Sequence, residues 1–95
     1  MGGVFKALSD QTRRDILKLL GKKDRTAGEI ADCFSISRPA ITRHLDILRE
    51  AELISSEKKG QYVIYSINVT VLQEALSGFL SFFDGESTKK GGDPD

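Results

Sequence analysis

Two helix-start signals stand close together in the middle of this chain and leave room for only a short helix between them. Thr26 and Glu29 have the spacing of a capping box, in which each side chain bonds a backbone N–H that the helix leaves unpaired. Ser37 caps the next helix, and Pro39 falls in its first turn, where a missing N–H does no harm. We therefore expect a short helix to about Phe34, a tight turn, and a second helix that begins at Ser37.

The second helix of this pair has one buried and one exposed face. Ile41, Leu45 and Leu48 recur at i, i+4 and i+7, so they should face the interior. The same geometry turns another set toward solvent, namely Pro39, Thr42, Arg43 and Asp46.

A longer helix precedes the pair. Either Ser9 or Asp10 can cap it, and it runs to Gly21. Its predicted buried stripe consists of Ile16, Leu17 and Leu20. Its charged residues are expected mostly to face away from the core: Arg13, Arg14, Asp15 and Lys18.

After Leu53 the pattern changes to that of β-strands. We expect strands over 53–56 and 62–67, the second of which is rich in β-branched and aromatic residues. The tip between them, residues 57–61, contains Lys58, Lys59 and Gln61. The segment is predicted to form a β-hairpin with a basic tip.

A last helix, from about Thr70 to Phe83, carries a broad apolar face. This face is wider than one small body needs to cover, so we expect it to join the apolar start of the chain in a homodimer interface. The expected interface residues are Val4, Phe5, Leu8, Leu72, Leu76, Phe79, Leu80 and Phe83. Residues 84–95 contain no apolar side chain, and we expect them to form a disordered tail after a single domain over 1–83.

Length and charge limit the partners. The chain has 95 residues, enough for one domain, and a formal net charge of zero. Its last twelve residues hold four acids and two lysines, so 12 basic and 10 acidic residues remain in the body. A surface for a polyanion must therefore be a local patch. No apolar run approaches the ~18 residues of a membrane span and no signal segment opens the chain, so we expect a cytoplasmic protein without membrane insertion.

Two short helices with an exposed polar strip, followed by a basic hairpin, match a winged helix-turn-helix. The major groove of DNA admits one α-helix, and an arginine can bond guanine O6 and N7 together. Lysines on the hairpin would reach phosphates or the adjacent minor groove. The candidate DNA-binding residues are Ser37, Arg38, Pro39, Thr42, Arg43, Lys58, Lys59 and Gln61. The predicted fold is thus mainly α with a small β-hairpin (α+β).

Three segments resemble the ArsR-type winged-helix repressors. The family's opening signature is similar to VFKALSDQTRR at 4–14, although Gln11 stands where the family usually has proline. Its recognition helix is similar to SRPAITRHLDIL at 37–48, and its wing to KGQYVIYSI at 59–67. The resemblance covers about residues 4–80 and is greatest to the metal-free, SdpR-like autorepressors. It implies an operator-binding homodimer, built by the first and last helices, that represses until a signal releases it. By elimination, since the residues indicate no metal site and no evident ligand cavity, the signal we expect is a protein partner that captures the DNA-binding surface.

Metal sensing, which is known in this family, does not fit these residues. Metal sites need clustered Cys, His or carboxylate ligands. The segment 26–30, where the family's cysteine-containing motif falls, has no cysteine, and the last helix holds only Glu74. We therefore expect no metal and no other cofactor.

The single histidine and the single cysteine have ordinary interpretations. His44 lies beside Leu45 at the margin of the buried stripe, which favours a packed or backbone-bonded side chain over a DNA contact or a pH switch. Cys33 follows Ile30 at helical spacing, as a small buried hydrophobe would. A redox role is disfavoured because no second cysteine is present to resolve an oxidised one.

Enzymatic function is disfavoured as well, because the chain has no paired acid and base in one motif and no phosphate-binding glycine loop. The main alternative is a winged-helix module that binds protein rather than DNA. A shift assay separates the two hypotheses, since only the repressor hypothesis predicts a shift with the protein's own promoter.

Overall fold

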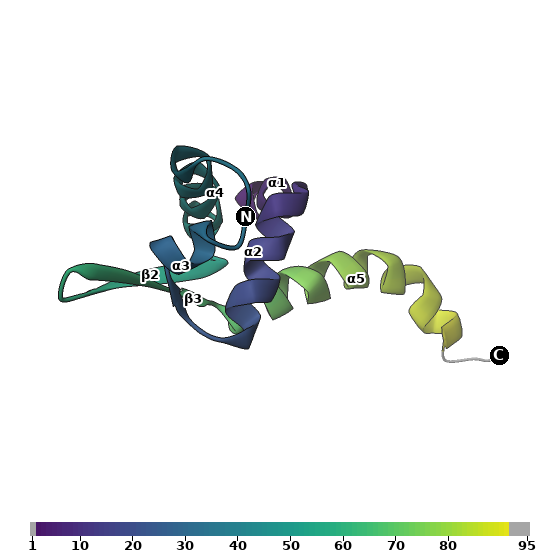
Figure 1. Cartoon of the computed structure of the whole chain (residues 1–95). Helices are drawn as coiled ribbons and strands as arrows, with labels where there is room; N and C mark the ends of the chain where they lie inside the picture. Colours follow the sequence, from purple (N-terminus) through teal and green to yellow (C-terminus); the bar gives the residue numbers. More distant parts are fainter. Residues whose placement is uncertain (1, 92–95) are drawn as a thin grey trace.

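The computed structural model describes residues 2–91, with side-chain positions for residues 3–83, and forms these residues into helices and one small sheet (Figure 1). The elements in chain order are α1 (Gly2–Leu8), α2 (Gln11–Lys22), β1 (Arg25–Thr26), α3 (Ala27–Ala31), α4 (Arg38–Glu50), β2 (Ile54–Lys59), β3 (Tyr62–Ile67) and α5 (Val69–Gly91). The strands are antiparallel in the order β1-β3-β2. This confirms the predicted fold class.

The helix caps predicted from the sequence are formed. Thr26 Oγ1 accepts a hydrogen bond from Glu29 N at 3.1 Å, and Glu29 Oε1 accepts one from Thr26 N at 2.9 Å. Ser37 Oγ accepts from Ala40 N at 3.3 Å at the start of α4. At α2 the cap is Asp10. The caps therefore set where both helices of the helix-turn-helix begin.

The helix α3 is shorter than expected, ending at Ala31 instead of near Phe34. The following amides bond only three residues back, Cys33 N to Ile30 O at 3.0 Å and Phe34 N to Ala31 O at 3.1 Å. Such bonds tighten the chain out of α-helical geometry. They begin the turn that leads into α4.

The sequence did not indicate the two-residue strand β1. Its residues pair with β3, Arg25 opposite Tyr65 and Thr26 opposite Ile64. Thr26 both ends this strand and caps α3. The sheet therefore joins the start of the helix-turn-helix to the hairpin β2–β3, which we call the wing.

The hydrophobic core lies between the helices of the body and the base of the sheet. Among the described residues, its buried members all fall between positions 4 and 54. They are Val4, Ala7, Ile16, Leu17, Leu20, Ile30, Ile41, Leu45, Leu48, Ala51, Leu53 and Ile54. The predicted stripes of α2 and α4 are thus confirmed. Val4, only 4% exposed, is already covered within one chain, so little of it remains for the dimer interface predicted for it.

The end of α4 turns the chain directly into the wing. Glu52 N donates to Arg49 O at 2.9 Å and Leu53 N donates to Leu48 O at 3.0 Å, the paired bonds of a Schellman motif. This motif needs a positive φ, and Glu52 adopts 64° where glycine is the usual residue. The turn places Leu53 in the core and fixes the start of β2 against α4.

The last helix, α5, extends away from the body, on the side opposite the wing (Figure 1). The radius of gyration is 16.2 Å, whereas a compact chain of this length has about 12 Å. We expected the helix to end near Phe83, but its backbone continues to Gly91, and residues 69–91 contain no proline to stop it. Residues 92–95 lie outside the described residues. The disorder of the tail over 84–95 stays a prediction. No helix in the described range is long and apolar enough to cross a membrane.

Candidate nucleic-acid interface

The start of α4, the recognition helix, presents the predicted strip to solvent. Ser37, Arg38, Pro39, Thr42 and Arg43 are all exposed. A shallow hollow of about 270 Å³ lies beside this strip, lined by Ser37, Pro39, Ala40, Arg43 and His44. Because the Ser37 cap and Pro39 define the first turn, these side chains project from a fixed backbone.

Arg38 lies at the junction of α3 and α4. A Cβ added at Gly28 of α3 would come within 3.8 Å of Arg38 Nη2, so the guanidinium extends across the first turn of α3. Arg43 lies further along α4 and lines the hollow. Arg38 therefore lies against α3 and Arg43 beside the hollow, at different positions along α4.

Asp46, further along α4, is partly neutralised. Asp46 Oδ1 lies 3.5 Å from Arg49 Nη2, and Arg49 Nη1 donates to Ser56 Oγ on β2 at 3.5 Å. Both charged side chains are about half exposed, so the pair contributes little to stability. Arg49 nevertheless connects the recognition helix with the wing and offsets the charge of Asp46 near the exposed strip.

The two lysines of the wing lie in a strand and not in the tip, so the predicted five-residue tip is wrong. β2 runs to Lys59, which pairs with Tyr62 across a two-residue turn of Gly60 and Gln61. Gly60 has a φ of 63°, a conformation that glycine adopts without strain at the first position of a tight hairpin turn. This glycine lets the strands stay paired up to the turn. Lys58, Lys59 and Gln61 are all exposed.

Alternation along β2 puts the two lysines on opposite faces of the wing. Lys58 shares its face with the buried Ile54 and with Ser56, which accepts the bond from Arg49 of α4. Lys59 lies on the other face. Lys58 is therefore the lysine on the α4 side of the wing.

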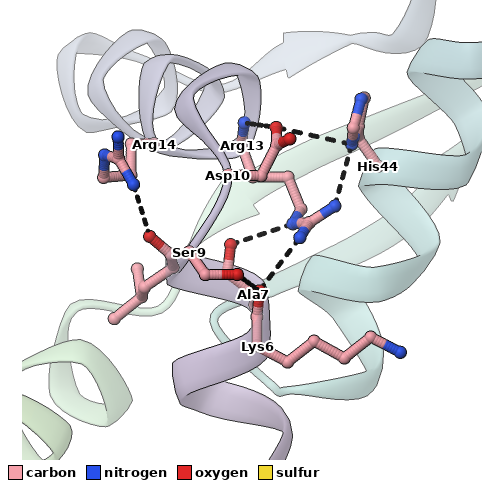
Figure 2. A network of polar contacts seen from close by, with 8 residues as sticks. Lys6, Ala7, Ser9, Asp10, Arg13, Arg14 and His44 are labelled. Carbon is pink, nitrogen blue, oxygen red and sulfur yellow. Dashed lines mark hydrogen bonds and ion pairs between the residues drawn. The ribbon is translucent and has the colours of Figure 1, made fainter.

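A buried arginine joins three elements behind the recognition helix (Figure 2). We expected Arg13 to face away from the core, but it is only 8% exposed. Its Nε donates to Ala7 O and its Nη2 to Lys6 O, each at 2.9 Å, and its Nη1 lies 3.1 Å from His44 Nδ1. The last carbonyls of a helix lack the usual amide partner four residues on and favour a cation, so the end of α1 provides a site for the guanidinium. Lys6 O also accepts from Ser9 N at 3.2 Å and from Ser9 Oγ at 2.7 Å.

The spacing of α2 did contain a signal for the burial of Arg13. Arg13 precedes Ile16 by three residues and Leu17 by four, so it lies on the same helical face as the buried stripe. Arginine is seldom buried without a partner, which led to the opposite prediction. Two of its partners are backbone carbonyls, which no side-chain pattern could indicate.

Asp10 completes this network. Its Oδ2 accepts a hydrogen bond from Arg13 N at 3.1 Å and lies 3.9 Å from His44 Nδ1. The backbone hydrogen bond from Arg13 lowers the pKa of the Asp10 carboxyl. The charge of Arg13 adds to this effect, whereas desolvation by burial opposes it.

The predictions for the lone histidine and cysteine have different outcomes. His44 is packed, as expected, with a side chain 18% exposed that contacts Arg13 and Asp10. Cys33 is exposed, so its predicted burial is wrong, because α3 ends before it and helical spacing no longer applies. Its Sγ donates to Glu29 O at 3.4 Å. Within the described residues, no group of three His, Cys, Asp or Glu side chains could hold a metal ion.

An apolar face extends from α1 along α5. We call it the α1–α5 face, and it consists of Phe5, Leu8, Leu72, Leu76, Phe79, Leu80, Phe82 and Phe83. Leu8 and Leu72 are half-buried, whereas the other six are between 44% and 77% exposed. Ring centroids of Phe5 and Phe79 lie 5.9 Å apart, which brings the two helices together. A groove of about 510 Å³ follows the face, lined by Val4, Phe5, Ala75, Gly78, Phe79 and Phe82.

A capped recognition helix after a tight turn, with a hairpin beside it, defines a winged helix-turn-helix protein. Residues 10–56, from the cap of α2 into β2, match the family described as bacterial regulatory protein, arsR family. The chain belongs to the ArsR family of bacterial regulatory proteins. It is therefore a transcriptional regulator and not an enzyme.

Its relatives include named repressors. The chain is 54% identical over 84 residues to the transcriptional repressor SdpR of Bacillus subtilis (strain 168), a match that spans 88% of this chain and 93% of the relative. It is 35% identical over 78 residues to the arsenical resistance operon repressor of the same organism, spanning 81% and 70%. Among solved structures, it is similar to an ArsR-like transcriptional regulator from Rhodococcus sp. RHA1, with a TM-score of 0.82, 31% identity and coverage of 96% and 86%.

Proposed function

We propose that this chain is a cytoplasmic repressor that binds an inverted-repeat operator as a homodimer, controls its own promoter and does not respond to metal. The observation that carries the proposal is the exposure of Arg38, Thr42 and Arg43 at the capped start of α4 in a member of a regulator family. Arginine can bond guanine O6 and N7 together, and threonine can contact the methyl group of thymine. The similarity to the named repressor SdpR supports repression.

The α1–α5 face supports the homodimer. Six of its large apolar side chains are exposed in the single chain, and they continue from α1 onto α5. A second copy would cover them with an identical apolar face, as in an isologous twofold interface. Two recognition helices related by this twofold would enter the major groove about 34–36 Å apart, which requires an inverted repeat.

Binding to promoter DNA tests the proposal. Fluorescence anisotropy would compare a labelled duplex from the protein's own promoter with a scrambled duplex of equal length and composition, at several salt concentrations. We expect the promoter to bind about 10³-fold more tightly than the scrambled duplex, or better, and a footprint with twofold symmetry. A protein that binds neither duplex at low salt is not a DNA-binding repressor, and this result would favour the protein-binding alternative.

Zinc calorimetry tests the absence of a metal response. Cys33 and His44 are the only thiol and imidazole in the chain, and they lie on different segments. We expect only weak, non-stoichiometric heat on titration of zinc into chelator-treated protein, with the same result for Cys33→Ser. A tight site of one zinc ion per subunit that also changes DNA affinity would refute this part of the proposal.

A further inference from the structure

The bond between Arg13 and His44 joins the recognition helix to the end of α1. Arg13 belongs to α2, its guanidinium bonds the carbonyl oxygens of Lys6 and Ala7 in α1, and it reaches His44 in α4 (Figure 2). The Arg13 side chain is buried and that of His44 is 18% exposed, so this contact is largely but not fully shielded from competing water. One side chain thus fixes the spacing of three helices.

The chemistry of this contact defines the state of His44. A guanidinium has only donors, so the 3.1 Å approach of Arg13 Nη1 requires His44 Nδ1 to be unprotonated and to accept the bond. The ring proton then lies on Nε2. A buried guanidinium that loses an acceptor is left with an unpaired donor, which is costly. His44 is therefore held by a specific bond at one ring nitrogen as well as by packing.

The other face of α1 reaches the proposed dimer interface. Phe5 lies on α1 with its ring against Phe79 of α5, one turn or less from the carbonyls that hold Arg13. The seven residues of α1 therefore contact the α1–α5 face through Phe5 and, through Arg13, the recognition helix. His44 also lines the hollow beside Arg43 in the DNA-facing strip.

We propose that Arg13 and His44 are positioning residues for DNA binding, through which the placement of α1 sets the orientation of the recognition helix. The proposal rests on the proposed function, because its first test measures affinity for DNA. It assigns His44 a role through Nδ1 and Arg13, and no direct contact with DNA.

Two amide substitutions test this assignment. In His44→Asn, the amide oxygen is bonded to Cγ as Nδ1 is, so it can accept the bond from Arg13. In His44→Gln, the amide lies one carbon further out, near the position of Nε2. We expect affinity for the promoter duplex to stay close to wild type in His44→Asn and to fall about tenfold in His44→Gln and in Arg13→Lys. All variants are compared at a temperature where circular dichroism shows them folded.

The opposite order of affinities for the two amide variants would overturn the proposal. If His44→Gln keeps the affinity and His44→Asn loses it, the histidine acts through Nε2 and contacts DNA directly. If all folded variants bind the promoter duplex as tightly as wild type, the pair does not position the helix.

A measurement without DNA separates this proposal from the proposed function. In ¹⁵N NMR spectra of the wild type, we expect His44 Nδ1 to be unprotonated and hydrogen-bonded. In Arg13→Lys this signature should be lost, and the amide signals of residues 38–43 should move, whereas His44→Asn should leave those amide signals near their wild-type positions. If wild type binds neither the promoter nor the scrambled duplex, the proposed function fails. The spectra still decide whether Arg13 and His44 position the recognition helix. Amide signals that stay unchanged in Arg13→Lys would overturn the positioning role.

Discussion

Asp10 stabilises the start of α2 in its charged form. Its carboxylate accepts the bond from Arg13 N, and the charge of Arg13 favours the same state, so its pKa lies below the ordinary value. A pKa that is lower in the folded chain means that the charged group stabilises the fold. This stabilisation is complete above the pKa of the unfolded chain and is lost as the pH falls through the lower folded-state pKa.

We expect Asp10→Ala to lower the free energy of unfolding by about 1 kcal/mol at pH 7, because the first turn of α2 loses its cap. Asp10→Asn keeps a capping oxygen and should lose less. Urea unfolding from pH 7 into the acid range measures both variants. The advantage of wild type over Asp10→Asn should shrink as the wild-type carboxyl becomes protonated, so an advantage that is the same at pH 7 and in strong acid would contradict this account.

For Arg13, the residue type led to a wrong prediction of exposure, although its position on the helix indicated burial. Helical spacing placed Ile16 and Leu17 in the core, and it would have placed Arg13 there too. The expectation that a charged side chain stays in water opposed this, and it fails where the carbonyls at a helix end offer a cation hydrogen-bond partners. For Cys33 the error is positional, since the spacing was extended beyond the end of α3.

At the scale of elements, the recognition helix and the wing should make different contributions to binding. Arg43 lies on a helix that can enter the major groove, whereas Lys58 and Lys59 lie on a hairpin suited to phosphates. A single duplex that contacts both α4 and the wing would meet the face of the wing that carries Lys58. We therefore expect the two lysines to differ in importance.

Arg43→Ala should cost about 1–3 kcal/mol on the promoter duplex and relax base preference in each half-site. Lys58→Ala should weaken promoter and scrambled DNA alike and lower the salt slope by about one per lost phosphate contact. Lys59→Ala is the matched control and should have the smaller effect. Binding isotherms over a range of salt concentrations measure all three variants. An Arg43→Ala variant that weakens both duplexes equally, beside a Lys59→Ala variant that affects only the promoter, would show that these roles are assigned wrongly.

Local sequence signals were sufficient for most helices and for the existence of the wing. The caps at Thr26 and Ser37 are short-range bonds, so a few neighbouring residues determine them. β1 was missed because its two residues form a strand only by pairing with Ile64 and Tyr65 in β3, far along the chain. The candidate site divides in the same way. The helical period of α4 predicts its exposed strip, whereas the contacts of Arg13 with His44 and with the end of α1 depend on the tertiary fold.

At the scale of the whole molecule, we expect Phe79→Asp to produce a monomer. Phe79 lies at the centre of the α1–α5 face, and an aspartate there would place a charge in the interface of two copies. Operator affinity should fall about 10²-fold or more, because the second half-site is no longer held nearby. Light scattering at micromolar concentration and promoter binding measure the two effects.

The matched control is Ser77→Asp, which adds the same charge to the polar side of α5 and should remain a dimer. Both variants should keep the wild-type circular dichroism, because neither side chain belongs to the core. A wild type that is monomeric at micromolar concentration would remove the basis of the dimer proposal.

The buried core is limited to positions 4–54, and the exposed apolar side chains of the α1–α5 face lie outside it. This separation affects how such a regulator would respond to its own concentration. The core residues are buried within one chain, so we expect the chain to fold before it pairs and the pairing to follow mass action. The concentration of dimers, which can occupy both half-sites, then rises with the square of the monomer concentration while dimers are scarce. Control of the protein's own promoter would therefore have a threshold, with little repression below the pairing concentration and a steep onset above it.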